Sequence, residues 1–329
     1  MSTPRPSRRP FRFGLQAFEA ASAADWKATA RRAEALGYST LFTSDHYFGP
    51  GRIADRTGHR PVDLAPLSAM AIAAAATETL KVGCRVFAAD YHQPVVLAKE
   101  TATLDFLTDG RVEVGIGAGW VADEYEGMGI EMDRPGVRIA RMAETVGLLR
   151  AHWSGEELDV SGEHVNVSGF RGVPAPVSPG GPPIMIGGGA PRVLRLAGRL
   201  ADIVSINFNN ASGKLGAQSV ASSTAERTHE KLSWVREGAG DRFDEIELET
   251  AAYFVVVTDQ PGPALGAMAA RFGVEPEVFA DVPHAFIGTV EQICEQLDQR
   301  REEFGFSYVT IAQRNMEDFA PIVAAMNGK

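Results

Sequence analysis

Short apolar runs alternate with longer segments of helical periodicity along the whole chain. The apolar runs are rich in β-branched and aromatic residues, which is typical of buried strands. This pattern predicts eight strands, at 11–16, 40–43, 80–86, 111–116, 184–186 and 201–206, then a seventh within 246–258 and an eighth at 307–312. Helices are predicted after them, at 22–36, 64–77, 94–107, 135–153, from 191, at 223–235, at 289–304 and at the C-terminus. Eight such repeats favour an α/β fold of the (β/α)8 TIM-barrel type over a doubly wound open sheet, which shares the alternation.

Three connections are too long to be simple loops. They are Phe48–Asp63 after strand 2, Ser154–Gly181 between helix 4 and strand 5, and Asn207–Ser222 after strand 6. The second contains a predicted hairpin at 157–167, and a further insert lies at 274–285. The insertions after strands 2 and 6 follow the carboxyl ends of strands, the face on which barrel enzymes place their sites.

Composition adds bounds on the class of protein. The chain has 329 residues, of which 45% are hydrophobic and 22% charged, as in ordinary globular proteins. We expect one domain over 11–329 behind a Pro/Arg-rich, disordered tail at 1–10. The two cysteines, Cys84 and Cys294, lack metal-ligand spacing and suit a reducing cytoplasm. A net charge of −10 argues against a nucleic-acid surface, and no apolar run is long enough to predict a membrane span.

A glycine-rich corner follows strand 5. There a short apolar strand enters three glycines and then a helix that begins at a proline; the residues are Gly187, Gly188, Gly189, Ala190, Pro191 and Arg192. Glycine permits positive φ and close approach of a ligand to the backbone, and proline suits the first helical position. A helix N-terminus with bare amides and a nearby arginine predicts an anion site, most often for phosphate. A tight turn without a ligand is the alternative.

Polar and small residues follow three further strands. Asp45 and His46 end strand 2, where a histidine could pass protons; a loop-anchoring Asp–His pair is the alternative. Strand 3 ends near an arginine that could meet an anion, and Cys84 there is expected to be a small buried filler. After strand 4, small residues could let a flat ring lie against the backbone and Trp120 could wall a pocket; a glycine-rich turn with a core tryptophan is as good an interpretation.

Three common catalytic motifs are absent from the sequence. The chain has no H-E-x-x-H zinc spacing, no G-x-S-x-G elbow and no G-x-x-x-x-G-K-[ST] loop. A metal-dependent hydrolase, a serine hydrolase and a P-loop enzyme therefore lack support, and no metal ligands are predicted.

In combination these segments resemble the bacterial luciferase-like monooxygenase superfamily, and within it the actinobacterial oxidoreductases that use coenzyme F420. The similarity runs from about Phe11 to the C-terminus and is carried by GYSTLFTSDHYF, LKVGCRVFAADYHQPVVLAKETATLDFLTDGRVEVGIGAGW, PPIMIGGGAPRVLRLAGRLADIV and FIGTVEQICEQL. The motifs are less decisive between F420 and FMN, because the two cofactors occupy the same kind of site. An FMN-dependent monooxygenase that uses oxygen is therefore the alternative, and a non-catalytic cofactor-binding barrel is a third reading.

The resemblance implies where the cofactor binds. Its ring would lie near the ends of strands 2 to 4, at Asp45, Gly83, Cys84, Arg85, Val86, Gly117, Ala118, Gly119 and Asp123. Relatives carry a bulge with a non-proline cis peptide after strand 3, which here would fall near Arg85–Val86. The phosphate of the tail would meet Gly187, Gly188, Gly189, Ala190, Pro191 and Arg192, in agreement with the anion site above.

The resemblance also assigns roles in catalysis. His46 matches the family histidine near the reactive carbon, and Asp45 would hold the ring or His46 in place. Gln16, His46, His92 and Trp120 are expected to line a pocket for a small-molecule substrate. The family's F420-dependent sugar-phosphate dehydrogenases carry a glutamate where this chain has Trp120, so an apolar or unsaturated substrate is expected instead. Relatives are commonly homodimers, and helices 64–77 and 94–107 could form such an interface.

Overall fold

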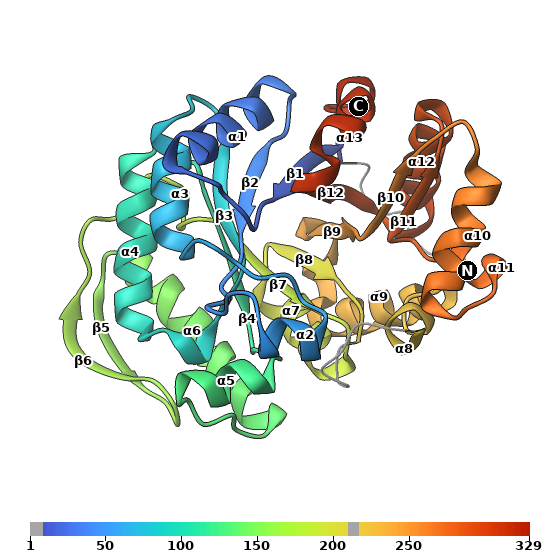
Figure 1. The fold of residues 1–329 in the computed structure, drawn as a ribbon. Helices are drawn as coiled ribbons and strands as arrows, with labels where there is room; N and C mark the ends of the chain where they lie inside the picture. The colour runs from blue at the N-terminus through green and yellow to red at the C-terminus, as the bar shows by residue number, and fades with distance from the viewer. Residues whose placement is uncertain (1–8, 210–216) are drawn as a thin grey trace. The chain divides into compact units, whose positions relative to one another are not determined.

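The computed structural model describes residues 9–209 and 217–329. Residues 1–8 of the predicted tail lie outside the described residues, as do residues 210–216 of the insertion after strand 6. The eight predicted barrel strands form a closed parallel barrel in the order β1-β12-β9-β8-β7-β4-β3-β2 (Figure 1). Their bounds are β1 Arg12–Gln16, β2 Thr40–Thr43, β3 Lys81–Ala88, β4 Val112–Gly117, β7 Ile184–Gly188, β8 Ile203–Ile206, β9 Glu247–Ala252 and β12 Phe306–Ala312. The predicted barrel class is thereby confirmed.

Each barrel strand leads into a helix, as the periodicity predicts. These helices are α1 Ala23–Ala35, α3 Pro66–Ala75, α4 Pro94–Leu107, α6 Pro135–Trp153, α7 Pro191–Leu200, α9 Ala225–Ala239, α12 Val290–Phe304 and α13 Met316–Met326. Shorter elements lie in the connections: α2 Arg52–Thr57, η1 Ala89–Tyr91, α5 Ala122–Met128, α8 Ala217–Ala221, η2 Gly240–Glu245, α10 Pro261–Phe272, α11 Pro276–Ala280 and η3 Gln313–Asn315. Within the described residues, no helix combines the length and the apolar character needed to cross a bilayer.

The chain divides into two compact units. The N-terminal unit comprises residues 17–32 and 40–187. The C-terminal unit comprises the described residues of 1–16, 33–39 and 188–329.

In the N-terminal unit, β2, β3, β4 and β7 pair in parallel. The register of β3 against β4 shifts between Cys84 and Phe87, and the peptide bond between Arg85 and Val86 is cis. Both features confirm the predicted bulge. The predicted hairpin is also present, as antiparallel β5 (Glu157–Ser161) and β6 (Asn166–Arg171), and its Leu158 packs on α6 (Figure 1).

In the C-terminal unit, the seventh barrel strand lies within 246–258, as predicted. It ends in the barrel at Ala252, and after Tyr253 the strand β10 (Phe254–Val257) pairs instead with β11 (Ala285–Gly288). Phe254 packs against Phe279, with 4.8 Å between ring centroids. Residues 254–257 therefore pack in a second apolar layer outside the barrel and do not extend the barrel strand β9.

The start of α9 also differs from the sequence expectation. Ser223 and Glu226 have capping-box spacing, but the N-cap is Thr224, whose hydroxyl accepts from the N–H of Arg227. The Ser223 hydroxyl instead accepts from the ammonium group of Lys231, at 3.1 Å. The capping-box spacing predicts that the Ser223 hydroxyl caps the helix, but this oxygen is instead bound by the buried Lys231.

Close backbone packing beside the bulge requires a glycine in β4. A Cβ atom on Gly115 would collide with the carbonyl oxygen of Cys84 and would lie 2.8 Å from the Val86 side chain. A carbonyl within a paired strand cannot move aside cheaply, because its movement would disturb the β3–β4 ladder.

We expect Gly115→Ala to lower the free energy of unfolding by about 3 kcal/mol, because the added methyl group overpacks the β3–β4 contact. Gly147→Ala is the matched control: Gly147 is exposed in α6, and a Cβ there meets nothing within 4 Å. The control should gain about 0.5–1 kcal/mol from helix propensity. Urea denaturation followed by circular dichroism measures both, and equal stabilities would contradict the packing argument.

Candidate functional site

Asp45 lies directly after β2 and is 2% exposed. Its Oδ2 accepts hydrogen bonds from the N–H of Ala88 and from Nε2 of His92, each at 2.8 Å. A buried carboxylate needs such partners. These two hydrogen bonds join the end of β2 to the end of β3 and to His92, which follows the short helix η1. Asp45 therefore positions His92, and His46 is held by a different acid.

That acid is Glu124, in α5. Its side chain is 1% exposed, and its Oε2 lies 2.7 Å from Nδ1 of His46. Its Oε1 accepts from the backbone N–H of Tyr47 at 2.6 Å. A carboxylate can only accept, so Nδ1 of His46 carries the hydrogen and the ring is fixed in one orientation. Nε2 is left as the atom for proton exchange, and it has no hydrogen-bond partner in the described part of the chain.

Aromatic rings enclose His46. The centroid of His59 lies 4.4 Å from that of His46, Phe48 lies at 5.5 Å and Trp120 at 6.1 Å. Trp120 and Phe48 also contact His59, at 5.8 and 5.7 Å between centroids. Burial, with the charge of His46, lowers the pKa of His59 to about 4, so His59 is neutral near pH 7. Burial and the Glu124 charge raise the pKa of Tyr91, whose hydroxyl stays protonated.

The β3 bulge places Val86 over the small residues of β4. A Cβ on Gly117 would lie 2.5 Å from Cγ2 of Val86. The side chain of Val86 therefore occupies the space beside Gly115 and Gly117, against which a flat ring was expected to lie. Val86 is itself partly exposed. Gly83 likewise admits no side chain, since a Cβ there would meet the Phe42 ring at 2.7 Å. Cys84 is fully buried, as its interpretation as a filler predicts, and burial raises the pKa of its thiol.

The remaining predicted residues of this unit lie after β4. Asp123 forms an ion pair with Arg56 at 3.0 Å, whereas its neighbour Glu124 points to His46. Ala118 is partly exposed, and Gly119 has φ of 68° and accepts a hydrogen bond from Arg138 through its carbonyl oxygen. Asp45, His46, His92 and Trp120 thus come together in the N-terminal unit.

The glycine corner leads into α7 of the C-terminal unit. Glycine is needed there for close packing and not for positive φ, because Gly187, Gly188 and Gly189 all avoid that region. A Cβ on Gly188 would collide with Val193, and one on Gly189 with the backbone of Phe208. The helix begins at Pro191, with Ala190 as its N-cap and no side-chain cap. Its first amides are therefore left for an anion, with exposed Arg192 beside them.

Gln16 also lies in the C-terminal unit. It is the last residue of β1 and pairs in register with Ala312 of β12.

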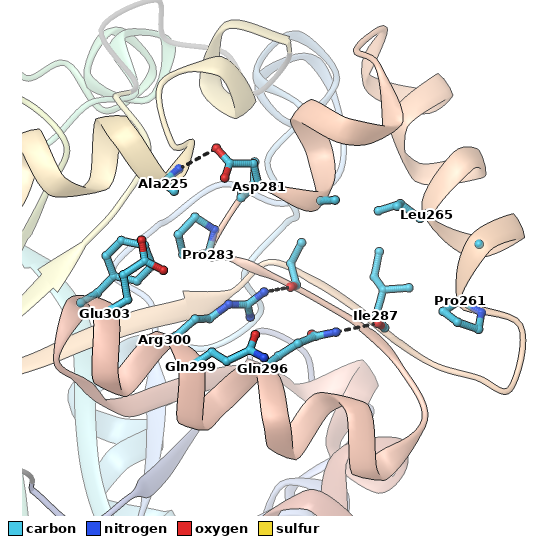
Figure 2. Close-up of a pocket in the computed structure, with 15 residues that line it drawn as sticks. Ala225, Pro261, Leu265, Asp281, Pro283, Ile287, Gln296, Gln299, Arg300 and Glu303 are labelled. Atoms are coloured by element: carbon cyan, nitrogen blue, oxygen red, sulfur yellow. Dashed lines mark hydrogen bonds between the residues drawn. The ribbon is translucent and has the colours of Figure 1, made fainter.

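A cavity of about 330 Å³ in the C-terminal unit contains none of the predicted site residues (Figure 2). It lies between α10, β11 and α12, where Gln296 donates to the carbonyl of Ile287 and Arg300 to that of Ala285. The Arg300 guanidinium lies 4.0 Å above the Phe286 ring, and burial lowers its pKa to about 9. These contacts brace α12 against β11.

Sequence reasoning missed His59 as a member of the site and did not pair Glu124 with His46. Glu124 is 78 residues from His46, and the acidic run around it also reads as a solvated helix start. His59 follows a short helix inside an insertion, where no periodicity marks it. The one available signal was that the insertion follows the carboxyl end of a barrel strand.

Comparison with known proteins gives two kinds of match. A sequence model of the luciferase-like monooxygenase family matches residues 9–261. The F420-dependent glucose-6-phosphate dehydrogenase of Mycobacterium tuberculosis is 30% identical over 264 residues, which cover 79% of this chain and 72% of that protein. The enzyme of the same name from Nocardia farcinica is 31% identical over the same shares of both chains.

Solved structures share the fold at lower identity. The coenzyme F420-dependent tetrahydromethanopterin reductase from Methanopyrus kandleri superposes with a TM-score of 0.74 at 15% identity, covering 97% of this chain and all of that one. A long-chain alkane monooxygenase gives a TM-score of 0.76 at 15% identity, covering 96% and 91%. At these identities the likeness concerns the fold alone.

The pKa of His59 makes a prediction for stability. Its folded value of about 4 lies below the value near 6.5 of an unfolded histidine, so the unfolded chain binds more protons between these two values. The free energy of unfolding should therefore fall as pH drops from 6.5 towards 4. His59→Gln should lose about 2 kcal/mol less than the wild type across this window. Denaturant unfolding at several pH values measures this, with pH 7.5 as the internal reference; parallel curves would refute it.

Proposed function

Because the chain belongs to the luciferase-like monooxygenase family, we propose that it is an F420-dependent oxidoreductase acting on a small organic substrate. The observation that carries the proposal is the His46–Glu124 pair at the end of β2, which leaves Nε2 of His46 facing an aromatic enclosure. Relatives that are at least 30% identical and are named for F420 favour that cofactor over FMN.

The residues present fit the proposed cofactor in two respects. The partly exposed Val86 on the β3 bulge offers an apolar surface against which a flat ring could lie. The start of α7, with Ala190 as N-cap, Pro191 at its first position and no side-chain cap, suits a phosphate group, and Arg192 adds a positive charge. When bound, the deazaflavin supplies or accepts the hydride.

The side chains around His46 then have separate tasks. Nε2 of His46 gives or takes the proton that accompanies the hydride, and Glu124 keeps the imidazole in the tautomer that allows this. Asp45, through Ala88 and His92, holds the end of β3 in place. Trp120 and His59 limit access of water to Nε2.

The enclosure favours an apolar or unsaturated substrate. Its walls are the neutral His59, Phe48 and Trp120, and the nearby arginines Arg56 and Arg60 are paired with Asp123 and Glu19. A sugar phosphate would need unpaired cations for its dianion. We therefore do not extend the substrate named for the mycobacterial relative to this chain.

An FMN-dependent monooxygenase that uses oxygen is the second candidate. The family description and the alkane monooxygenase among the structural neighbours favour it. Oxygen consumption during turnover separates the two, because hydride transfer to an organic substrate needs none.

We also propose a cytoplasmic homodimer. In the N-terminal unit, α3 and α4 expose Ile72, Val96, Phe106 and Leu107, with Leu107 71% exposed. Apolar side chains of this size on neighbouring helices suit a second copy of the chain. Both cysteines are free thiols, which suits a reducing compartment.

We expect the purified protein to bind F420 more tightly than FMN in fluorescence titrations. If the start of α7 holds the phosphate, Arg192→Gln should weaken F420 binding several-fold and leave binding of the phosphate-free deazaflavin riboside unchanged. Equal losses for both ligands would remove Arg192 from the phosphate site. Failure of F420 and FMN alike to bind would reject the proposed function.

We expect His46→Ala to slow single-turnover hydride transfer by 100-fold or more with F420 still bound, because the proton donor at Nε2 is lost. Glu124→Gln keeps the shape of the side chain but removes the charge that orients His46, and should slow the step less. Stopped-flow absorbance of the cofactor measures both rates, and an unchanged rate in His46→Ala would exclude this histidine from the mechanism.

A further inference from the structure

Two imidazole rings lie next to each other in the enclosure, tilted relative to one another, and each has its Nδ1 occupied. Nδ1 of His59 lies 2.7 Å from the carbonyl oxygen of Arg60, and Nδ1 of His46 lies 2.7 Å from Oε2 of Glu124. Both partners can only accept, so both Nδ1 atoms carry hydrogen. The ring centroids are 4.4 Å apart, with 53° between the planes.

The two Nε2 atoms differ in what they can do. Nε2 of His59 is a lone-pair acceptor, because Nδ1 carries the hydrogen and because burial, with the charge of His46, lowers the pKa of His59 to about 4. Nδ1 of His46 is engaged by Glu124, so Nε2 is the ring nitrogen of His46 that remains for a ligand. Over residues 9–209 and 217–329, neither Nε2 has a hydrogen-bond partner. The enclosure therefore presents a fixed acceptor, Nε2 of His59, beside Nε2 of His46, the atom to which the proposed function assigns proton transfer.

The walls around this pair are flat and uncharged. Besides Phe48 and Trp120, Phe18 meets the His59 ring edge-on at 5.8 Å. The charged groups nearby are already engaged: Glu124 by His46 and Tyr47, and Arg60 by Glu19. A planar, neutral ligand fits such walls, and an ion would lose its hydration there without a partner.

We propose that His59 determines substrate specificity, its Nε2 accepting a hydrogen bond from an N–H or O–H of a flat, unsaturated substrate. The matching chemical class is an unsaturated cyclic amide, whose N–H and carbonyl oxygen lie next to each other. Its N–H would meet Nε2 of His59, and its carbonyl oxygen would meet the proton on Nε2 of His46. The proposal rests on the proposed function for turnover, but it makes a claim about binding that needs no cofactor.

The test uses 5,6-dihydropyridin-2(1H)-one and its N-methyl derivative, in which a methyl group replaces the hydrogen of the N–H. Calorimetry without cofactor measures the Kd of each, and turnover with reduced F420 gives kcat/KM. The wild type should bind the N–H lactam about tenfold more tightly, since N-methylation leaves the acceptor unpaired. His59→Phe keeps a ring but has no acceptor, and it should abolish this preference.

Two further variants complete the design. His59→Gln retains an acceptor oxygen and should restore part of the preference, which separates loss of the hydrogen bond from a disturbed fold. His229→Phe, an exposed histidine of α9, is the matched control and should keep the wild-type ratio.

The proposal is overturned if the wild type binds neither lactam, if it binds both equally, or if the preference survives in His59→Phe. Absence of F420 binding with the lactam preference intact would reject the proposed function and keep this inference. F420-dependent turnover of other substrates without a lactam preference would reject this inference and keep the proposed function.

Discussion

A buried carboxylate is the constraint around which the candidate site is organised. Glu124 is almost fully removed from water, so its charge must be met by hydrogen bonds inside the protein. The backbone of Tyr47 and the imidazole of His46 supply them. Because the acid consumes Nδ1, the histidine presents only Nε2 to the enclosure, in one orientation. Two residues that are 78 positions apart in the sequence thus fix the orientation of this imidazole.

The second carboxylate has a structural task. Asp45 accepts from Ala88 and from His92, and so joins the end of β2 to the segment that follows the β3 bulge. The adjacent residues Asp45 and His46 therefore belong to two different acid–imidazole pairs: Asp45 binds His92, and His46 binds Glu124. The same strand end supports the site through Asp45 and presents Nε2 of His46 to the aromatic enclosure.

Much of the fold and part of the site follow from local patterns. The bounds of β2, α4 and α6 agree with the prediction, because apolar runs and helix-starting prolines mark them directly. The bulge at Arg85–Val86 was also expected, from the family resemblance. The seventh strand was located only to within 246–258, because its apolar run continues into β10, and only the aromatic layer around Phe254 tells the two pieces apart.

The sequence by itself determined the eight β/α repeats, the glycine corner before α7 and the presence of Asp45 and His46 at a strand end. The tertiary structure decided which groups meet: Glu124 with His46, His92 with Asp45, and Val86 with the glycines of β4. The reason is one of range. Periodicity and turn residues act between neighbours in the chain, whereas hydrogen bonds and close packing join residues that only the folded barrel brings together.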